Sequence, residues 1–280
     1  MNLRLISISI LVSIAWAVGA WELWDTFAHF NSQWYWFVLA TVYTLTLNEA
    51  FAHRICTHNL FKVDVESKTY KILVFLLSVD HAWSPLTDAC ITHLNHHMYS
   101  DQGDRDNLNY RRHWYSFCML SPIMYLYQLP TNYPDADKFF KRQEQQFKHI
   151  LDDDWTFFCE EFRVPLTVLF WAVLYFVLPI VLFKIVLMGR FLMSIYMAIA
   201  SIGTHVNLPF SYRNYNTNDT TQNNLILHTV CLGCLSSMLH NNHHANPSKI
   251  WQNLRWYEYD LGYWIIKLLR PGLEKVDTSR

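Results

Sequence analysis

Four long apolar stretches constrain what this chain can fold into more than any other feature of its sequence. They lie at residues 3–21, 34–52, 164–183 and 185–204. A helix needs roughly 20 mostly apolar residues to cross the hydrocarbon core of a membrane. We therefore predict an all-α membrane protein with four transmembrane helices.

The composition supports this prediction. Hydrophobic residues make up 52% of the chain and aromatic residues 16%, with only 7 glycines, which is unusual for a soluble domain. The first stretch has some features of a secretory signal. However, only Arg4 precedes its apolar core, and it continues into Trp21 and Trp24, as expected at a membrane interface. We expect it to be retained as a transmembrane helix.

The positions of lysine and arginine predict the orientation. Of 22 such residues, twelve lie between Arg54 and Arg163 and seven follow His205, whereas only Lys184 and Arg190 lie near the junction of the third and fourth stretches. The positive-inside rule then places both termini and the two large polar regions on the cytoplasmic side. We expect residues 53–162 and 205–280 to form one helical cap there. Without repeats or flexible linkers, residues 1–280 are predicted to be a single domain.

Charge and cysteine content exclude some classes of protein. The net charge of −1 and the pI near 6.9 give no indication of nucleic-acid binding, and we expect no nucleic-acid partner. The six cysteines lie in or beside apolar stretches. This favours buried, reduced thiols over a disulfide framework.

Three clusters of histidine have spacings that suit metal binding. They are His53 and His58 in HRICTH, His93, His96 and His97 in HLNHH, and His240, His243 and His244 in HNNHH. On an α-helix, positions i, i+3 and i+4 lie at about 0°, 300° and 400°, so each triad shares one face. His53 and His58 are about 140° apart on an α-helix, so they would bind one ion only if the helix ended between them, and otherwise they would straddle two.

The type and number of ligands indicate two oxidisable ions. Neutral imidazole is a common ligand of iron, zinc and copper, and two triads with a pair exceed what one ion can use. A zinc hydrolase needs only three protein ligands and a water. An all-imidazole site also lacks the carboxylates of soluble di-iron bundles and favours iron over hard cations.

These motifs are similar to those of a known family. HRICTH, THLNHHMYSDQGDRDN, the isolated His205, LHNNHHANP and LRWYEYDLGYWIIKLL resemble the membrane fatty acid desaturases, of the stearoyl-CoA desaturase type, from about Glu49 to Leu269. The resemblance implies a di-iron centre at the cytoplasmic face above a hydrophobic acyl tunnel. It implies that the ligands are His53, His58, His93, His96, His97, His205, His240, His243 and His244.

The chain departs from the family pattern at several positions. Ser201 stands where the family commonly has an asparagine that reaches a metal through water, and Ala89 stands where an aromatic residue usually shapes the tunnel. The selectivity of the family for acyl chain length and double-bond position is therefore not carried over to this chain.

Other polar residues are candidates for supporting the ligands by hydrogen bonds. Glu49 lies four residues before His53, so on a helix its carboxylate could accept the free N–H of that ring; the alternative is an interface-facing carboxylate. Ser201 and Asn241 are further candidates. For Asp101, Asp104 and Asp106 we favour a solvated loop.

The resemblance implies a reaction. Two reduced irons would activate dioxygen, and the resulting oxidant would remove two hydrogens from a long acyl chain to form a double bond. The chain has no dinucleotide fingerprint, so an external donor such as a ferredoxin or a cytochrome is expected. The acyl group could be carried on CoA, on a carrier protein or in a lipid. The alternatives are an acyl or alkyl hydroxylase on the same scaffold and a membrane metal transporter, although the middles of spans three and four have almost none of the polar residues that a transporter requires.

Overall fold

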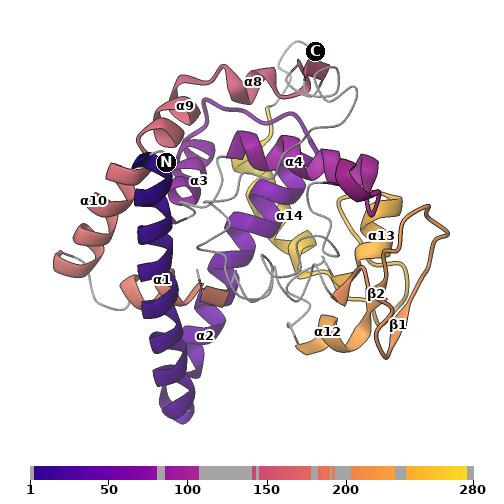
Figure 1. The fold of residues 1–280 in the computed structure, drawn as a ribbon, viewed down its shortest axis with the longest axis horizontal. Helices are drawn as coiled ribbons and strands as arrows, with labels where there is room; N and C mark the ends of the chain where they lie inside the picture. Colours follow the sequence, from indigo (N-terminus) through magenta and orange to yellow (C-terminus); the bar gives the residue numbers. More distant parts are fainter. Residues whose placement is uncertain are drawn as a thin grey trace.

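The chain is mostly helical in the parts that the computed structural model describes (Figure 1). These are residues 3–80, 86–106, 141–142, 145–177, 182–189, 191–192, 203–230 and 238–275. The elements are α1 (Leu3–Ala28), α2 (Phe30–Thr44), η1 (Leu45–Thr57), α3 (Lys68–Asp80), α4 (Leu86–Tyr99), η2 (Gly103–Arg105), α8 (Lys148–Leu151), α9 (Asp154–Glu161), α10 (Arg163–Phe176), β1 (Ser211–Tyr212), β2 (Asn223–Asn224), α12 (Leu225–Val230), α13 (His240–Ala245) and α14 (Leu261–Leu273).

Three long helices pack side by side at one end of the molecule. α1 and α2 form an antiparallel hairpin with a single residue, His29, between them, and α10 lies along the outer side of α1 (Figure 1). The predicted spans 3–21 and 164–183 begin within α1 and at the start of α10. Residues 178–181 and most of 185–204 lie outside the described residues.

Within the described ranges, the structure contains no helix that is both long enough and apolar enough to count as a membrane-crossing segment. The four spans therefore stay a prediction.

α2 changes its winding before it reaches the first histidine cluster. It runs without a break into η1, which is a π-helix of 13 residues. A π-helix bonds each N–H to the carbonyl five residues back; it is rare in proteins and frequently occurs at functional sites. The side chain of Asn48 donates to the carbonyl of Thr44 at 3.0 Å, within this wider turn. The predicted span 34–52 thus extends from α2 into η1.

The main hydrophobic core surrounds η1. Phe51 is fully buried and meets the ring of Tyr70 on α3 edge to face, with centroids 5.9 Å apart. The hydroxyl of Tyr70 lies 2.8 Å from that of Thr156 on α9, which satisfies both buried groups. α4 and α14 pack against the same π-helix, with Ile266 of α14 in the core. η1 is therefore held on several sides.

The region before α13 contains a small sheet. β1 and β2 pair antiparallel, with Ser211 opposite Asn224 and Tyr212 opposite Asn223, and Asn223 also forms an isolated bridge to Leu239. The all-α prediction missed these strands because two-residue strands leave no alternating pattern to detect. The bridge places the start of α13 beside the sheet.

Candidate metal centre

The first histidine cluster lies at the end of η1. The helix ends at Thr57, and His58 follows as its C-cap, with its backbone N–H 3.3 Å from the carbonyl of His53. This i→i+5 bond brings the two rings to 5.1 Å between centroids. Both rings therefore belong to the same group, which is the alternative that required the helix to end between them. The other alternative, that they straddle two ions, assumed α-helical winding up to His58 and does not apply.

The second and third clusters each contribute to two groups. In α4, His93 and His97 point to one group and His96 to the other. In α13 the division is reversed, since His243 joins the first group and His240 and His244 the second. Each triad thus lies on one helix face, but its i and i+4 rings belong to one group and its i+3 ring belongs to the other.

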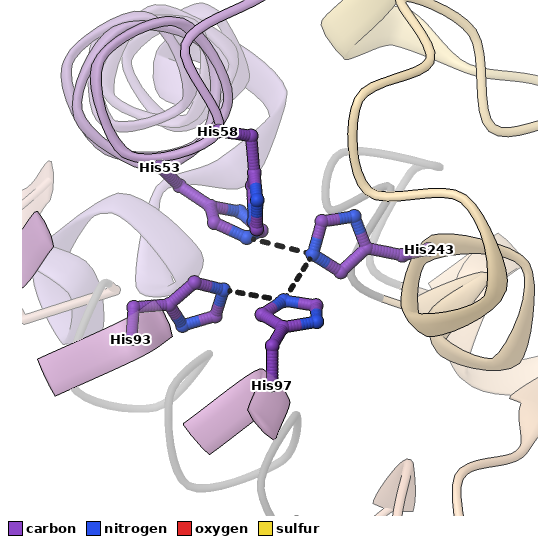
Figure 2. Close-up of side chains that lie close together, drawn as sticks. All are labelled: His53, His58, His93, His97 and His243. Atoms are coloured by element: carbon purple, nitrogen blue, oxygen red, sulfur yellow. Dashed lines mark hydrogen bonds between the residues drawn. The ribbon is translucent and has the colours of Figure 1, made fainter. Parts of the chain in front are cut away.

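Nine histidines form the two groups, whose candidate ligand atoms lie within 4.8 Å of one another in each. The five-histidine group consists of His53, His58, His93, His97 and His243, and the four-histidine group of His96, His205, His240 and His244. Figure 2 shows the five rings of the first group converging from three separate segments of the chain. The two groups adjoin, because the rings of His97 and His244 stack with centroids 4.2 Å apart.

The distances between ring nitrogens match ligands of one ion. Nε2 of His97 lies 2.9 Å from Nε2 of His243 and 3.0 Å from that of His93, and Nε2 of His243 lies 3.1 Å from that of His53 (Figure 2). In the other group, Nε2 of His205 and His240 are 3.0 Å apart. Two nitrogens bound at about 2.1 Å and at right angles to each other are about 3.0 Å apart.

Hydrogen bonds between the rings do not account for this packing. A neutral imidazole has one N–H and one lone pair. Nδ1 of His53 faces a carboxylate of Glu49 at 2.9 Å and must be the donor, so its Nε2 has only a lone pair. His243 then has a single N–H for two neighbours. Nε2 of His58 and of His244 are buried without a hydrogen-bond partner within the described structure. A bound ion would accept all of these lone pairs, so the residues present fit a metal.

Burial keeps the rings in the form that binds metals. It lowers the pKa of His58, His93, His97, His240 and His243 well below the ordinary value, and neighbouring histidines lower it further. Burial also lowers the pKa of His244 to about 4, against a hydrogen bond that raises it. These rings are neutral at pH 7, and neutral imidazole is the ligand form.

Four carboxylates hold the far sides of the rings. Nδ1 donates to Glu49 from His53, to Asp106 from His96 and to Asp219 from His244, each at 2.9 Å, and Nδ1 of His205 lies 3.2 Å from Asp101. An ionised carboxylate only accepts, so each contact places the hydrogen on Nδ1 and leaves Nε2 for a metal. Glu49 is therefore a buried partner of His53 rather than an interface-facing group.

The interpretation of Asp101 and Asp106 as solvated is wrong. Asp101 has a left-handed backbone with φ of 65°, which turns the chain back after α4, and its N–H donates to Asp106 at 2.8 Å. Asn95 of α4 donates to the carbonyl of Arg105 at 2.8 Å, so the turn is closed onto the helix. The sequence suggested a surface loop because this turn is polar. The side chain of Asp104 lies outside the described residues.

Sequence analysis missed Asp219. Its carboxylate also accepts from the hydroxyls of Thr217 and Thr221 at 2.6 and 2.5 Å. Burial raises the pKa of Asp219, but the hydrogen bonds from His244 and the threonines hold it well below its usual range. Burial also raises the pKa of Asp101, but His205 and the hydrogen bonds from Thr220 lower it by more, so that the pKa lies below its usual range. Asp219 lies 25 residues before His244, and no local spacing connects the two.

Asn241 supports the centre in a different way from the one we expected. Its side-chain oxygen accepts from the N–H groups of Asn214 and Tyr215 at 2.9 and 2.8 Å, so it anchors α13 to that loop. The neighbouring Asn242 donates to Glu258 at 3.1 Å, and Glu258 also accepts from Asn214 at 2.7 Å. Ser201 lies outside the described residues.

The other histidines that the structure describes lie outside the two groups. His29 is exposed, with Nδ1 3.0 Å from the carbonyl of Asp25, and His149 is half-buried. His228 is fully buried beside Tyr259, and neither of its ring nitrogens has a hydrogen-bond partner within the described structure. His81 and His113 lie outside the described residues.

Comparison with known proteins agrees with this geometry. A family model described as fatty acid desaturase matches residues 28–273, a range that contains all nine grouped histidines. No protein in a comparison with curated sequences matches the chain significantly.

Proposed function

The chain belongs to the fatty acid desaturase family, and on that premise we propose that it is a di-iron, dioxygen-dependent desaturase that introduces a double bond into a long acyl chain. Membership of the family implies an oxidoreductase. The observation that carries the proposal is the pair of adjoining histidine groups, each with the nitrogen spacing of ligands around one ion.

The proposed ligands are the nine histidines of the two groups, with Nε2 of His58 and of His244 among the contacts. Two irons bound there would supply the activation of dioxygen and the oxidising power to remove hydrogen from an unactivated methylene. An all-imidazole set suits iron. The burial that lowers the pKa of six of these rings keeps those six neutral, and it limits the access of water to the centre.

The protein's own part in the reaction is positioning. Neighbouring methylenes are chemically alike, so choosing one requires a fixed acyl chain held close to the centre. The carboxylates at Nδ1 fix the orientation of four rings. The side chains of Asn241 and Asn242 fix α13, which supplies His240, His243 and His244, by holding it against the loop before it.

We also propose that the chain is an integral membrane protein with four spans and with residues 53–162 and 205–280 on the cytoplasmic side. Nζ of Lys184 lies 3.0 Å from Glu22 and 3.4 Å from Asp25. These residues lie between the predicted spans, in the two segments that the positive-inside rule places on the opposite side, so their pairing supports that topology. The exposed apolar side chains of α10, including Leu169 and Phe176, support contact with lipid.

Electrons must enter from a partner. Reducing dioxygen to water consumes more electrons than the loss of two hydrogens from the acyl chain releases. The sequence has no dinucleotide fingerprint, so an external donor such as a ferredoxin or a cytochrome would supply the rest. The substrate is a fatty acyl group carried on CoA, on a carrier protein or in a lipid.

Expression in a host that lacks its own desaturase tests the proposal. We expect new unsaturated acyl chains by mass spectrometry, and about two tightly held irons per purified chain. The variant His243→Ala should lose both, whereas His228→Leu, outside both groups, should keep them. Hydroxylated chains would indicate the hydroxylase, and exchangeable zinc without any product would indicate a transporter. If the iron-loaded protein supplied with reductant formed no oxidised product, the proposal would be wrong.

A further inference from the structure

The carboxylates are distributed unequally between the two histidine groups. Three of the four rings in the four-histidine group contact an aspartate, namely Asp101, Asp106 or Asp219. In the five-histidine group, the contact between His53 and Glu49 is the one carboxylate contact that the described residues make.

These carboxylates are buried or nearly so, and each of them accepts hydrogen bonds from other groups of the protein. The side chains of Asp106, Asp101 and Asp219 are 0%, 9% and 12% exposed. Asp219 accepts from two threonine hydroxyls, Asp101 from the N–H and hydroxyl of Thr220, and Asp106 from the N–H of Asp101. Their negative charges therefore act through protein rather than through water, where they would be screened.

The two positions consequently have different charges around them. A divalent ion with neutral imidazoles and three aspartates has a net charge of about −1, whereas one with a single glutamate has about +1, counting one charge for each carboxylate. A further cation, Arg54, lies near enough to the five-histidine group for its charge to act on His58. Arg54 is paired with Asp260, so the two charges largely cancel. The pair therefore does not make the surroundings of the five-histidine group more negative.

We propose that Asp101, Asp106 and Asp219 make the two irons unequal, so that the ion in the four-histidine group has the lower reduction potential and is oxidised first. Losing an electron raises the charge of an ion, and nearby negative charge stabilises the more highly charged state. A carboxylate at Nδ1 also makes the ring a stronger donor to the metal through Nε2. The three aspartates act through the histidines and are positioning residues, not ligands. The inference rests on the proposed binding of iron.

Anaerobic redox titration of the purified, iron-loaded full chain tests this inference. Redox mediators take up the electrons, and Mössbauer and electron paramagnetic resonance spectra follow the two irons. We expect two separate one-electron midpoints in the wild-type protein. Asp219→Asn should raise the lower midpoint and leave the upper one in place. If the variant changes the ratio of the site's affinities for ferric and ferrous iron tenfold, the midpoint potential shifts by about 59 mV.

Glu49→Gln is the matched control, because it makes the same carboxylate-to-amide change on the other group. It should raise the upper midpoint and leave the lower one in place. Asp219→Glu, which keeps the charge, should restore the wild-type values, and circular dichroism and iron content show whether each variant is folded and loaded. If Asp219→Asn loses iron, the titration is repeated on Asp106→Asn, for which the same shift is expected.

Three results would overturn the inference. They are a single shared midpoint in the wild-type protein, a shift of the upper midpoint by the aspartate variants, and a shift of the same midpoint by the aspartate and glutamate variants. A wild-type protein that binds no iron would instead refute the proposed function, so the two failures are distinguishable.

Discussion

Nη1 of Arg54 donates to both carboxylate oxygens of Asp260, at 2.9 and 3.1 Å, across 206 residues of sequence. The two side chains are 0% and 2% exposed, so this ion pair is completely buried. Arg54 follows His53 in η1, and it also donates to the backbone carbonyl of Ile250, beyond α13. Asp260 caps α14 by accepting from the N–H of Tyr263. The pair therefore ties the first histidine cluster to the segment that follows the third.

Removal of one partner of this pair should destabilise the protein strongly. In Asp260→Asn the cap acceptor remains, but the guanidinium group is left buried without its counter-charge. We expect the free energy of unfolding to fall by about 3–5 kcal/mol. Unfolding in mixed micelles, followed by circular dichroism, measures this. The double variant Arg54→Met with Asp260→Asn should recover part of the loss, and an Asp260→Asn protein as stable as the wild type would contradict the expectation.

Close contact of α1 with Leu187 and Phe191 should make Gly19 intolerant of a side chain. A Cβ there would overlap the backbone oxygen of Leu187 and lie 2.8 Å from Cβ of Phe191. An alanine normally stabilises a helix interior by about 1 kcal/mol relative to glycine. We expect the opposite sign here, a loss of about 1–3 kcal/mol, because the backbone must move.

Gly272→Ala is the matched control for Gly19→Ala. At that position the new Cβ would meet the hydroxyl of Thr69 at 2.5 Å. A threonine side chain can rotate away, whereas a backbone oxygen cannot, so the loss should be smaller. Equal thermal unfolding midpoints for the two variants would show that the α1 contact is not tight.

His228 should make the stability depend on pH. Burial lowers its pKa below the ordinary value of about 6.5, so the unfolded chain takes up a proton at a pH where the folded chain does not. Its contribution is therefore complete above pH about 6.5 and is lost as the pH falls below that value. His228→Leu should flatten the slope of unfolding free energy between pH 6.5 and 5.5 by up to about 1.4 kcal/mol per pH unit.

The same variant should not be destabilised at pH 7. Within the described structure neither ring nitrogen of His228 makes a hydrogen bond of normal length and angle, and a buried polar group in that state costs about 1–3 kcal/mol. Replacement by leucine removes that cost. A steeper pH slope in His228→Leu, or a large loss of stability at pH 7, would indicate a partner for this ring.

Metal removal should destabilise the protein through the histidine groups. A chelator should lower the thermal midpoint, and added Fe²⁺ should restore it, because an ion that binds only the folded state stabilises it by about 2.7 kcal/mol at a concentration 100 times its Kd. His58→Ala should reduce this restoration, since the Nε2 of His58 is one of the buried lone pairs. His149→Ala, outside both groups, should show the full effect. An equal effect of metal on both variants would exclude His58 from the centre.

Local spacing was enough to predict which histidines gather. In α4 and α13, positions i, i+3 and i+4 share a face on any α-helix, so the triads could be identified before any tertiary contact was known. The same rule placed Glu49 next to His53. His205 was identified through the resemblance of the motifs to the fatty acid desaturases. The mostly helical architecture also agreed with the composition and the long apolar stretches.

Other features depended on non-local contacts. The division of each triad between two groups follows from the directions in which α4, α13 and η1 approach one another, which helical periodicity does not encode. The π-helical winding that aligns His53 with His58 replaces the expected hydrogen bonds by i→i+5 bonds, and apolar periodicity does not reveal it.

The sequence by itself determined the kinds of side chain available and the local geometry within each helix: neutral imidazoles at metal-binding spacing, in a chain rich in apolar residues. Only the tertiary structure decided how the rings are shared between two positions and which carboxylates stand behind them. The contact of Asp219 with His244 shows why, since two side chains 25 residues apart meet only when the folded backbone closes the loop between them. Periodicity carries information over one or two turns of helix, whereas the centre is assembled from segments that are distant in the chain.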